Sequence, residues 1–218
     1  MIKAGRGDAI VAVRSSATSE DLAGASFAGQ LESILSVQGK VYLMEAIKKC
    51  WESLFTPRVI FYRKNKGFNE FPSMGVIVQR MIQAEKAGVM FTVNPMNKNN
   101  EQIVIESAWG YGESIVSGLV TPDEYIVDKK SGSIISRRVG KKKWLRRMDP
   151  VTGAVIKEDV EPSKVSMESV TASEIKKLWE LAKRDEEYYG GKPQDIEWCI
   201  EKNRAFLVQT RPITTLGE

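Results

Sequence analysis

One stretch near the end of the chain organises the rest: Asp195-Ile196-Glu197-Trp198-Cys199-Ile200-Glu201, then Lys202-Asn203-Arg204, then residues 205–211. Polar and apolar residues alternate in both runs, and a short polar segment separates them. This pattern predicts a β-hairpin. A three-residue loop sets Glu201 opposite Ala205, Glu197 opposite Gln209 and Asp195 opposite Arg211.

These pairs define two faces of the predicted hairpin. Because side chains alternate along a strand, Asp195, Glu197, Gln209 and Arg211 share one face. The opposite face is expected to be buried and holds Ile196, Trp198, Ile200, Phe206 and Val208. Two carboxylates, an amide and a guanidinium on one sheet face form a candidate site for a metal ion and a phosphate. The alternative is a solvated face with one cross-strand ion pair.

The composition narrows the chemistry open to the chain. Its 218 residues, 42% hydrophobic and 28% charged, suffice for one large globular domain or two small ones. The net charge of +4 does not by itself indicate nucleic acid. Since the chain has no histidine, a Ser-His-Asp relay, a His-metal site and a phosphohistidine are excluded from it. Catalysis has to use carboxylates, Lys, Arg, hydroxyls, backbone amides or a metal held by oxygen ligands.

Cysteine usage and hydropathy indicate the compartment. Cys50 and Cys199 show neither metal-ligand spacing nor a disulfide framework, so a reducing cytoplasmic location is expected. No stretch approaches the roughly 18 apolar residues of a membrane span, and the N-terminus lacks a signal-peptide apolar region. We therefore expect no membrane partner.

A second candidate site begins at Arg14. The apolar run 10–13 predicts a strand that delivers this arginine at its end, and residues 15–30 are rich in Ser, Thr, Ala and Gly. Arginine donates to phosphate in a fork geometry, hydroxyls and backbone amides add neutral donors, and glycine lets the backbone approach a ligand. On composition alone, a plain surface loop is the alternative.

Periodic patterns predict the surrounding elements. Residues 40–66 predict two helices separated at Pro57, the first with Leu43, Ile47, Cys50 and Leu54 in one apolar stripe. Strands are predicted over 75–82, 88–92, 102–105 and 121–128, and a polar loop over 150–170. Thr171-Ala-Ser-Glu174 is a capping box that begins a helix reaching about residue 188. The expected class is α+β, with helices packed on a mixed, mostly antiparallel sheet.

Seven basic residues gather between positions 137 and 147, with Trp144 among them. A nucleic-acid interface needs a stripe of charge with aromatic platforms, and this run fits that description in part. An exposed, charged hairpin with a packed tryptophan accounts for it better, because the charge elsewhere is near balance. We do not expect nucleic acid as a partner.

Four blocks occur in a fixed order along nearly the whole chain. They are Val11-Ala-Val-Arg-Ser-Ser-Ala-Thr-Ser-Glu-Asp-Leu22 with Ala25-Ser-Phe-Ala-Gly-Gln30, then Gly88-Val-Met-Phe-Thr-Val-Asn-Pro95, then Glu106-Ser-Ala-Trp-Gly-Tyr-Gly-Glu113 with Val120-Thr-Pro-Asp-Glu-Tyr125, and the hairpin through Gln209-Thr-Arg-Pro212. Together they resemble the nucleotide-binding domain of the phosphoenolpyruvate synthase (pyruvate, water dikinase) family. Pyruvate phosphate dikinase and rifampicin phosphotransferase carry related domains.

The resemblance implies an ATP-grasp fold, in which ATP lies between two α+β lobes, here residues 1–74 and 75–218. In that family ATP phosphorylates a histidine on a separate mobile domain, and the phosphohistidine then phosphorylates pyruvate on a barrel domain. The chain would be the ATP-binding and phosphotransfer module of such a dikinase. A module of a rifampicin phosphotransferase-like enzyme and a non-catalytic nucleotide-binding remnant are the alternatives.

The resemblance also implies roles for single residues. Arg14 and Arg211 would bind the phosphates and act in catalysis. Gly29 and Ser33 match positions that line the phosphates, and Gln79 matches a position that lines the nucleotide site beside the adenine pocket.

Metal binding is implied at the hairpin. Glu197 and Gln209 would hold Mg²⁺ through oxygen, and Asp195 would support either the metal or Arg211. The family also carries a glycine-rich loop and a phosphate-binding lysine before the Arg-Ser-Ser block, but only thirteen residues precede Arg14. Lys3 lies in no comparable context. We therefore expect a partial module that lacks part of the N-terminal lobe and does not complete a dikinase cycle alone.

Overall fold

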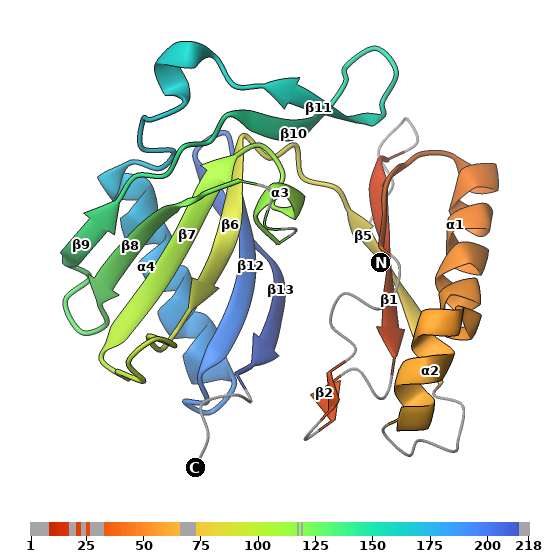
Figure 1. Ribbon diagram of the computed structural model, residues 1–218, viewed down its shortest axis with the longest axis horizontal. Helices are drawn as coiled ribbons and strands as arrows, with labels where there is room; N and C mark the ends of the chain where they lie inside the picture. Colours follow the sequence, from red (N-terminus) through yellow and green to blue (C-terminus); the bar gives the residue numbers. More distant parts are fainter. Residues whose placement is uncertain are drawn as a thin grey trace. The chain divides into compact units, whose positions relative to one another are not determined.

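The computed structural model describes residues 9–17, 21–22, 25–26, 33–65, 73–116, 118 and 120–213. The chain forms two compact units, Met1–Met81 and Ile82–Glu218, and each is described by itself (Figure 1). The strand over residues 74–80 pairs along its whole length with the first strand of the chain and belongs to the first unit.

The first unit is built on a three-stranded antiparallel sheet in the order β4-β1-β5. Its strands are β1 (Val11–Ala17), β4 (Ser33–Val37) and β5 (Met74–Arg80), and a two-residue pair, β2 (Asp21–Leu22) and β3 (Ala25–Ser26), lies outside this sheet. Helix α1 (Lys40–Glu52) packs on the sheet through Ala46 and Cys50, which are buried with Val13 and Val37.

The predicted helix pair of the first unit is confirmed. After α1 comes one turn of 3-10 helix, η1 (Ser53–Phe55), and then α2 (Pro57–Asn65). Proline stands at the first position of α2, where its missing N–H costs no hydrogen bond. Leu43 and Ile47 of the predicted apolar stripe are partly buried against the core, and Leu54 is buried.

The second unit is built on a six-stranded sheet in the order β13-β12-β6-β7-β8-β9. The strands are β6 (Lys86–Phe91), β7 (Gln102–Trp109), β8 (Asp123–Asp128), β9 (Ile134–Arg138), β12 (Gln194–Glu201) and β13 (Arg204–Pro212). Neighbouring strands of this sheet are antiparallel. The class predicted from the sequence, α+β with a mostly antiparallel sheet, is confirmed.

Helix α4 (Ala172–Tyr188) covers one face of this sheet (Figure 1). Its buried Ile175, Leu178 and Ala182 pack on a core that includes Met90, Ile105, Ile196, Trp198 and Ile200. The predicted capping box is present: the Glu174 N–H donates to Thr171 Oγ1 at 3.3 Å, and the Thr171 N–H donates to Glu174 Oε2 at 2.7 Å. Glu174 also accepts from Lys86 Nζ at 2.8 and 2.7 Å, which joins α4 to β6.

The other face of the sheet is partly covered by a short helix and a hairpin. These are α3 (Glu113–Val116) and the pair β10 (Trp144–Met148) and β11 (Val155–Asp159), followed by η2 (Pro162–Lys164). Ala108, Ile115 and Val120 form a small buried cluster there, with Val89 and Trp144 packed against it. The polar loop predicted over 150–170 is therefore wrong for β11, which pairs with β10 along five residues.

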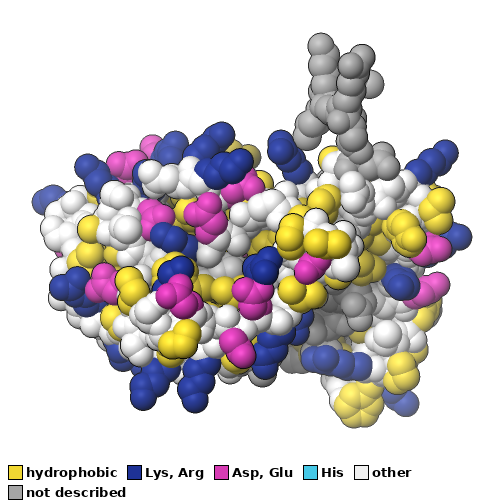
Figure 2. All heavy atoms as spheres, turned by 90° about the horizontal axis from the view of Figure 1, so that it is seen from above, with side chains coloured by type: hydrophobic (Ala, Val, Ile, Leu, Met, Phe, Trp, Pro, Cys, Tyr) yellow, Lys and Arg dark blue, Asp and Glu magenta, His cyan; other side chains and the backbone are white. Residues whose placement is uncertain are grey.

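The basic run is not one exposed hairpin, as the sequence predicted. It is divided between β9, β10 and the segment that joins them. Lys142 is fully buried in an ion pair with Asp123, and four arginines pair with carboxylates: Arg137 with Glu168, Arg138 with Glu124, Arg146 with Glu113 and Arg147 with Glu158. Figure 2, seen from above, shows basic (dark blue) and acidic (magenta) side chains interspersed over the second unit. Five of the seven basic residues of the run are therefore compensated by carboxylates.

Within the described ranges, no helix is both long enough and apolar enough to cross a membrane.

Candidate functional site

The hairpin of β12 and β13 carries the candidate site of the second unit. Glu197 lies opposite Gln209 and Asp195 opposite Arg211, which confirms both predicted pairs. The predicted three-residue loop is wrong, because Glu201 pairs with Arg204 and not with Ala205. The turn consists of Lys202 and Asn203, whose φ values of 48° and 62° are the left-handed geometry that a two-residue hairpin turn requires.

A β-bulge restores the predicted register beyond the turn. Between the Glu197–Gln209 and Trp198–Leu207 pairs, β13 contains one extra residue, Val208. A one-residue shift exchanges the two faces of a strand. Hence Ala205 and Leu207 pack on the core, and the predicted burial of Phe206 and Val208 on that face is wrong.

Beyond the bulge, the side chains of β13 lie on the faces of the sheet that the sequence predicted. Thr210 lies on the α4 side, where its hydroxyl donates to Asp185 Oδ2 at 2.6 Å. Gln209 and Arg211, which flank Thr210 in sequence, therefore point to the opposite face. They share that face with Glu197 and Asp195.

Arg211 and Asp195 form a closely bonded ion pair. Arg211 Nε donates to Asp195 Oδ2 at 2.8 Å, and Nη2 lies 2.7 Å from the same oxygen. The Arg211 side chain is 39% exposed and that of Asp195 is 15% exposed. The Asp195 carboxylate thus holds one edge of the Arg211 guanidinium. Asp195 was expected to support either the metal or Arg211, and this contact favours the second role.

Glu197 and Gln209 supply a carboxylate and an amide oxygen side by side on half-buried positions. No group of three or more His, Cys, Asp or Glu side chains is placed to hold a metal within the described part of the chain. Mg²⁺ in phosphate-transferring sites is usually held by one or two protein ligands together with phosphate oxygens and water. The oxygen donors at Glu197 and Gln209 therefore suit an ion that arrives with a polyphosphate.

Predicted residues of the first unit also gather on one sheet face. Arg14 pairs with Ser33 on β4 and with Ile77 on β5, and Ala12 pairs with Gln79. Directly opposed residues share a face, as do residues two apart on a strand. Arg14, Ser33 and Gln79 therefore lie on the face opposite the Val13 side chain, which packs beneath α1. Gly29 lies outside the described residues.

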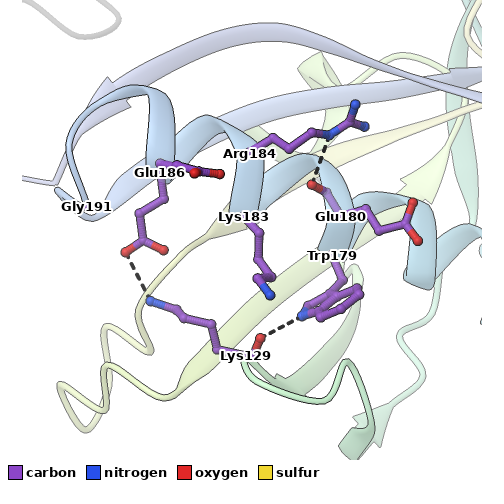
Figure 3. A pocket seen from close by; sticks show the side chains of 8 residues that line it. Lys129, Trp179, Glu180, Lys183, Arg184, Glu186 and Gly191 are labelled. Carbon is purple, nitrogen blue, oxygen red and sulfur yellow. Dashed lines mark hydrogen bonds and ion pairs between the residues drawn. The ribbon is translucent and has the colours of Figure 1, made fainter.

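A hollow of about 600 Å³ opens beside α4, away from the predicted residues. Its lining includes Lys129, Trp179, Lys183 and Glu186 (Figure 3). Lys129 pairs with Glu186 at 3.1 Å, Trp179 Nε1 donates to the Lys129 carbonyl at 2.9 Å, and Lys183 Nζ lies 4.7 Å from the Trp179 ring centroid. Because these groups contact one another, we assign the hollow no ligand.

Sequence reasoning gave no role to Glu106, although it stands at the head of one of the four motif blocks. Pairing across three strands places Glu197 beside Val89 and Val89 beside Glu106. This row depends on the register of strands that are far apart in sequence, so local patterns did not reveal it.

The chain is thus an α+β domain that carries a polar sheet face in each of its two units. The chain belongs to the family described as pyruvate phosphate dikinase, AMP/ATP-binding domain, whose model matches residues 1–218.

Curated relatives agree with this membership. The chain is 49% identical, over 94% of its length and 27% of the relative's, to a protein named probable phosphoenolpyruvate synthase from Archaeoglobus fulgidus. It is 45% identical, over 97% of its length and 18% of the relative's, to one so named from Methanocaldococcus jannaschii. It is 41% identical, over 94% of its length and 23% of the relative's, to rifampicin phosphotransferase of Bacillus cereus. The chain thus spans less than a third of the length of each of these relatives.

Proposed function

We propose that the chain is the ATP-binding and phosphotransfer module of a phosphoenolpyruvate synthase, with an ATP-grasp fold. The whole enzyme would convert ATP, pyruvate and water to phosphoenolpyruvate, AMP and phosphate. The observation that carries the proposal is the pairing of Glu197 with Gln209 and of Asp195 with Arg211 on one sheet face. This set combines oxygen ligands with a phosphate-binding guanidinium, within a family described as AMP/ATP-binding.

Each side chain has a defined task in this proposal. Arg211, held by Asp195, and Arg14 of the first unit donate hydrogen bonds to phosphate oxygens and offset their negative charge. Ser33 and Gly29 line the phosphates, and Gln79 lines the nucleotide site. These residues position the transferred group and do no covalent chemistry themselves.

Glu197 and Gln209 would hold Mg²⁺, with Asp195 acting through Arg211. When bound, the ion would supply charge neutralisation on the polyphosphate. As in the family that the chain resembles, we propose that the phosphate acceptor is a histidine on a separate domain and that pyruvate binds a barrel domain. The acceptor cannot lie in this chain, because it has no histidine. Both described cysteines are free thiols, which suits the cytoplasmic location that we propose.

Calorimetric titration with Mg·ATP tests the proposal. We expect saturable binding by the wild-type chain and a loss of about tenfold in affinity for Glu197→Gln, because hydrogen bonds and ligation by charged groups are worth roughly 1.5–3 kcal/mol. Glu158→Gln, on the β10–β11 hairpin, is the matched control and should bind as the wild type does. A folded wild-type chain that binds no nucleotide at millimolar ATP would refute the proposal.

Two alternatives share the same site. A rifampicin phosphotransferase module is suggested by the 41% identity to the Bacillus cereus protein of that name. A non-catalytic remnant would bind ATP but transfer nothing. Transfer of label from ATP to a histidine-bearing domain of a relative, supplied in trans, excludes the remnant, and the acceptor that then becomes labelled, pyruvate or rifampicin, separates the two enzymes.

A further inference from the structure

A row of side chains crosses the face of the second unit's sheet opposite α4, which α3 and the β10–β11 hairpin cover in part. In spatial order it contains Gln209, Glu197, Val89, Glu106, Glu124 and Arg138. Since directly opposed residues project to the same side, the row extends the Glu197–Gln209 pair from the edge of the sheet towards its middle. Glu106 is the next polar side chain after Glu197.

Glu106 differs from the neighbouring Glu124 in its bonding. Glu124 Oε2 accepts a hydrogen bond from Arg138 Nη2 at 3.2 Å. No described residue donates a hydrogen bond to the Glu106 carboxylate, which is half-buried. Burial raises the pKa of Glu106, the charge of Glu124 raises it further, and Arg138 opposes both effects.

A partly desolvated carboxylate without a donor is costly, so a bound group that supplies donors would be favoured there. Hydroxyl groups supply such donors, since a carboxylate accepts two hydrogen bonds from a vicinal diol.

The position of Glu106 along the row indicates which diol. Two strand spacings of about 4.8 Å separate it from Glu197. In a nucleoside triphosphate the ribose follows directly after the phosphates, so a nucleotide whose phosphates lie at Glu197 and Gln209 can present its ribose to the next carboxylate in the row. Val89, between them, packs in part against the cluster of Ala108, Ile115 and Val120 and adds no competing polar group.

We propose that Glu106 accepts hydrogen bonds from the ribose hydroxyls of the bound nucleotide and so selects ribonucleotides over deoxyribonucleotides. This inference rests on the proposed function, because it takes the phosphates to lie at Glu197 and Gln209. Glu106 is a specificity-determining residue in this scheme and takes no part in phosphate transfer.

The test is calorimetric titration with the Mg²⁺ complexes of ATP, 2′-deoxy-ATP and 2′,3′-dideoxy-ATP. We expect the wild-type chain to bind the dideoxy analogue on the order of tenfold more weakly than ATP, the value of one or two hydrogen bonds to a charged acceptor. Glu106→Met should bind all three nucleotides with the weaker affinity, and Glu106→Gln should lie between. Glu124→Gln is the matched control, one strand away, and should discriminate as the wild type does.

Several results would overturn the inference. One is equal affinity of the wild-type chain for the three nucleotides, and a second is unchanged discrimination in Glu106→Met. A third is that the wild type prefers ATP over inosine triphosphate and that Glu106→Met abolishes this preference instead. That result would assign the carboxylate to the adenine amino group. The wild-type comparison needs no variant, so misfolding of a variant does not block the test. A wild-type chain that binds no nucleotide refutes the proposed function, whereas one that binds ATP without regard to the ribose refutes only this inference.

Discussion

Arg211 directs two nitrogens of its guanidinium, Nε and Nη2, at the single oxygen Oδ2 of Asp195, at 2.8 and 2.7 Å. The two residues face each other across the β12–β13 ladder, so the backbone register itself brings them together. The contact fixes the direction of a side chain that is otherwise 39% exposed. A guanidinium oriented in this way loses less conformational entropy when it binds a phosphate.

Asp195→Asn tests this orienting role. The amide keeps the size of the side chain but removes the charge, so we expect the Mg·ATP affinity to fall by about tenfold, the scale of one charge-assisted hydrogen bond. The unfolding free energy should change by less than about 1 kcal/mol because the pair is partly exposed. Titration calorimetry and urea denaturation measure the two effects. Wild-type affinity in Asp195→Asn would show that Arg211 needs no support.

The buried ion pair of Lys142 and Asp123 predicts a large effect on stability. Both side chains are fully buried, and Asp123 also accepts hydrogen bonds from the Gly140 N–H at 2.9 Å and from the Ser169 N–H at 2.7 Å. Lys142→Met leaves the carboxylate without its cation, which should lower the unfolding free energy by about 3–5 kcal/mol. Lys141→Met, at the exposed neighbouring position, should change it by less than about 0.5 kcal/mol.

Urea denaturation of both lysine variants measures the two changes in unfolding free energy. Equal midpoints for Lys142→Met and Lys141→Met would mean that the buried pair does not form in solution.

Gly88 on β6 predicts a strict size limit in the sheet. A Cβ at this position would lie 1.8 Å from the Glu106 carbonyl oxygen and 2.7 Å from Trp198 Cζ2. Gly88→Ala should therefore lower the unfolding free energy by about 1–3 kcal/mol or more, the cost of overpacking. At Gly75 on β5 the nearest atom is the Ser16 carbonyl oxygen at 3.6 Å, so Gly75→Ala should be tolerated. Thermal melts compare the two, and a melting temperature unchanged by Gly88→Ala would contradict the close approach of β7 and Trp198 to this glycine.

The raised pKa of Glu106 predicts that replacing its carboxylate with a neutral group stabilises the folded chain, and that this gain depends on pH. Its pKa is raised above the usual 4.5, first by burial and then by Glu124, so ionisation is harder in the folded chain than in the unfolded one. The loss of folding free energy caused by the ionised Glu106 carboxylate is present at neutral pH. It disappears as the pH falls below the pKa of Glu106 in the unfolded chain. Glu106→Gln should thus raise the melting temperature at pH 7, and the gain should vanish near pH 4.

Glu124→Gln serves as the control for that experiment. It removes the Glu124 partner of Arg138 as well as the repulsion of Glu106, so it should give a smaller gain or none. Melting curves between pH 4 and 7 provide the comparison. A gain for Glu106→Gln that is the same at every pH would exclude the charge as its cause.

Local patterns predicted those parts of the fold that depend on neighbours in sequence. The capping box at Thr171 and Glu174 depends on residues three apart, and the helix break at Pro57 follows from the ring of a single residue. The Glu197–Gln209 pair was predicted from alternation, yet by way of a loop of the wrong length. The two-residue turn and the bulge at Val208 shift the register by one residue each, in opposite directions, and their effects cancel beyond the bulge.

The sequence by itself determined the family, the α+β class and the polar character of the hairpin, because motifs and side-chain alternation are properties of consecutive residues. Only the tertiary structure decided that Lys142 is buried against Asp123, that Phe206 and Val208 do not share the face of Trp198, and that Glu106 stands in the same row as Glu197. Those relationships depend on the register of strands brought together from distant parts of the chain, and register is fixed by the packing of whole faces against α4 and its core.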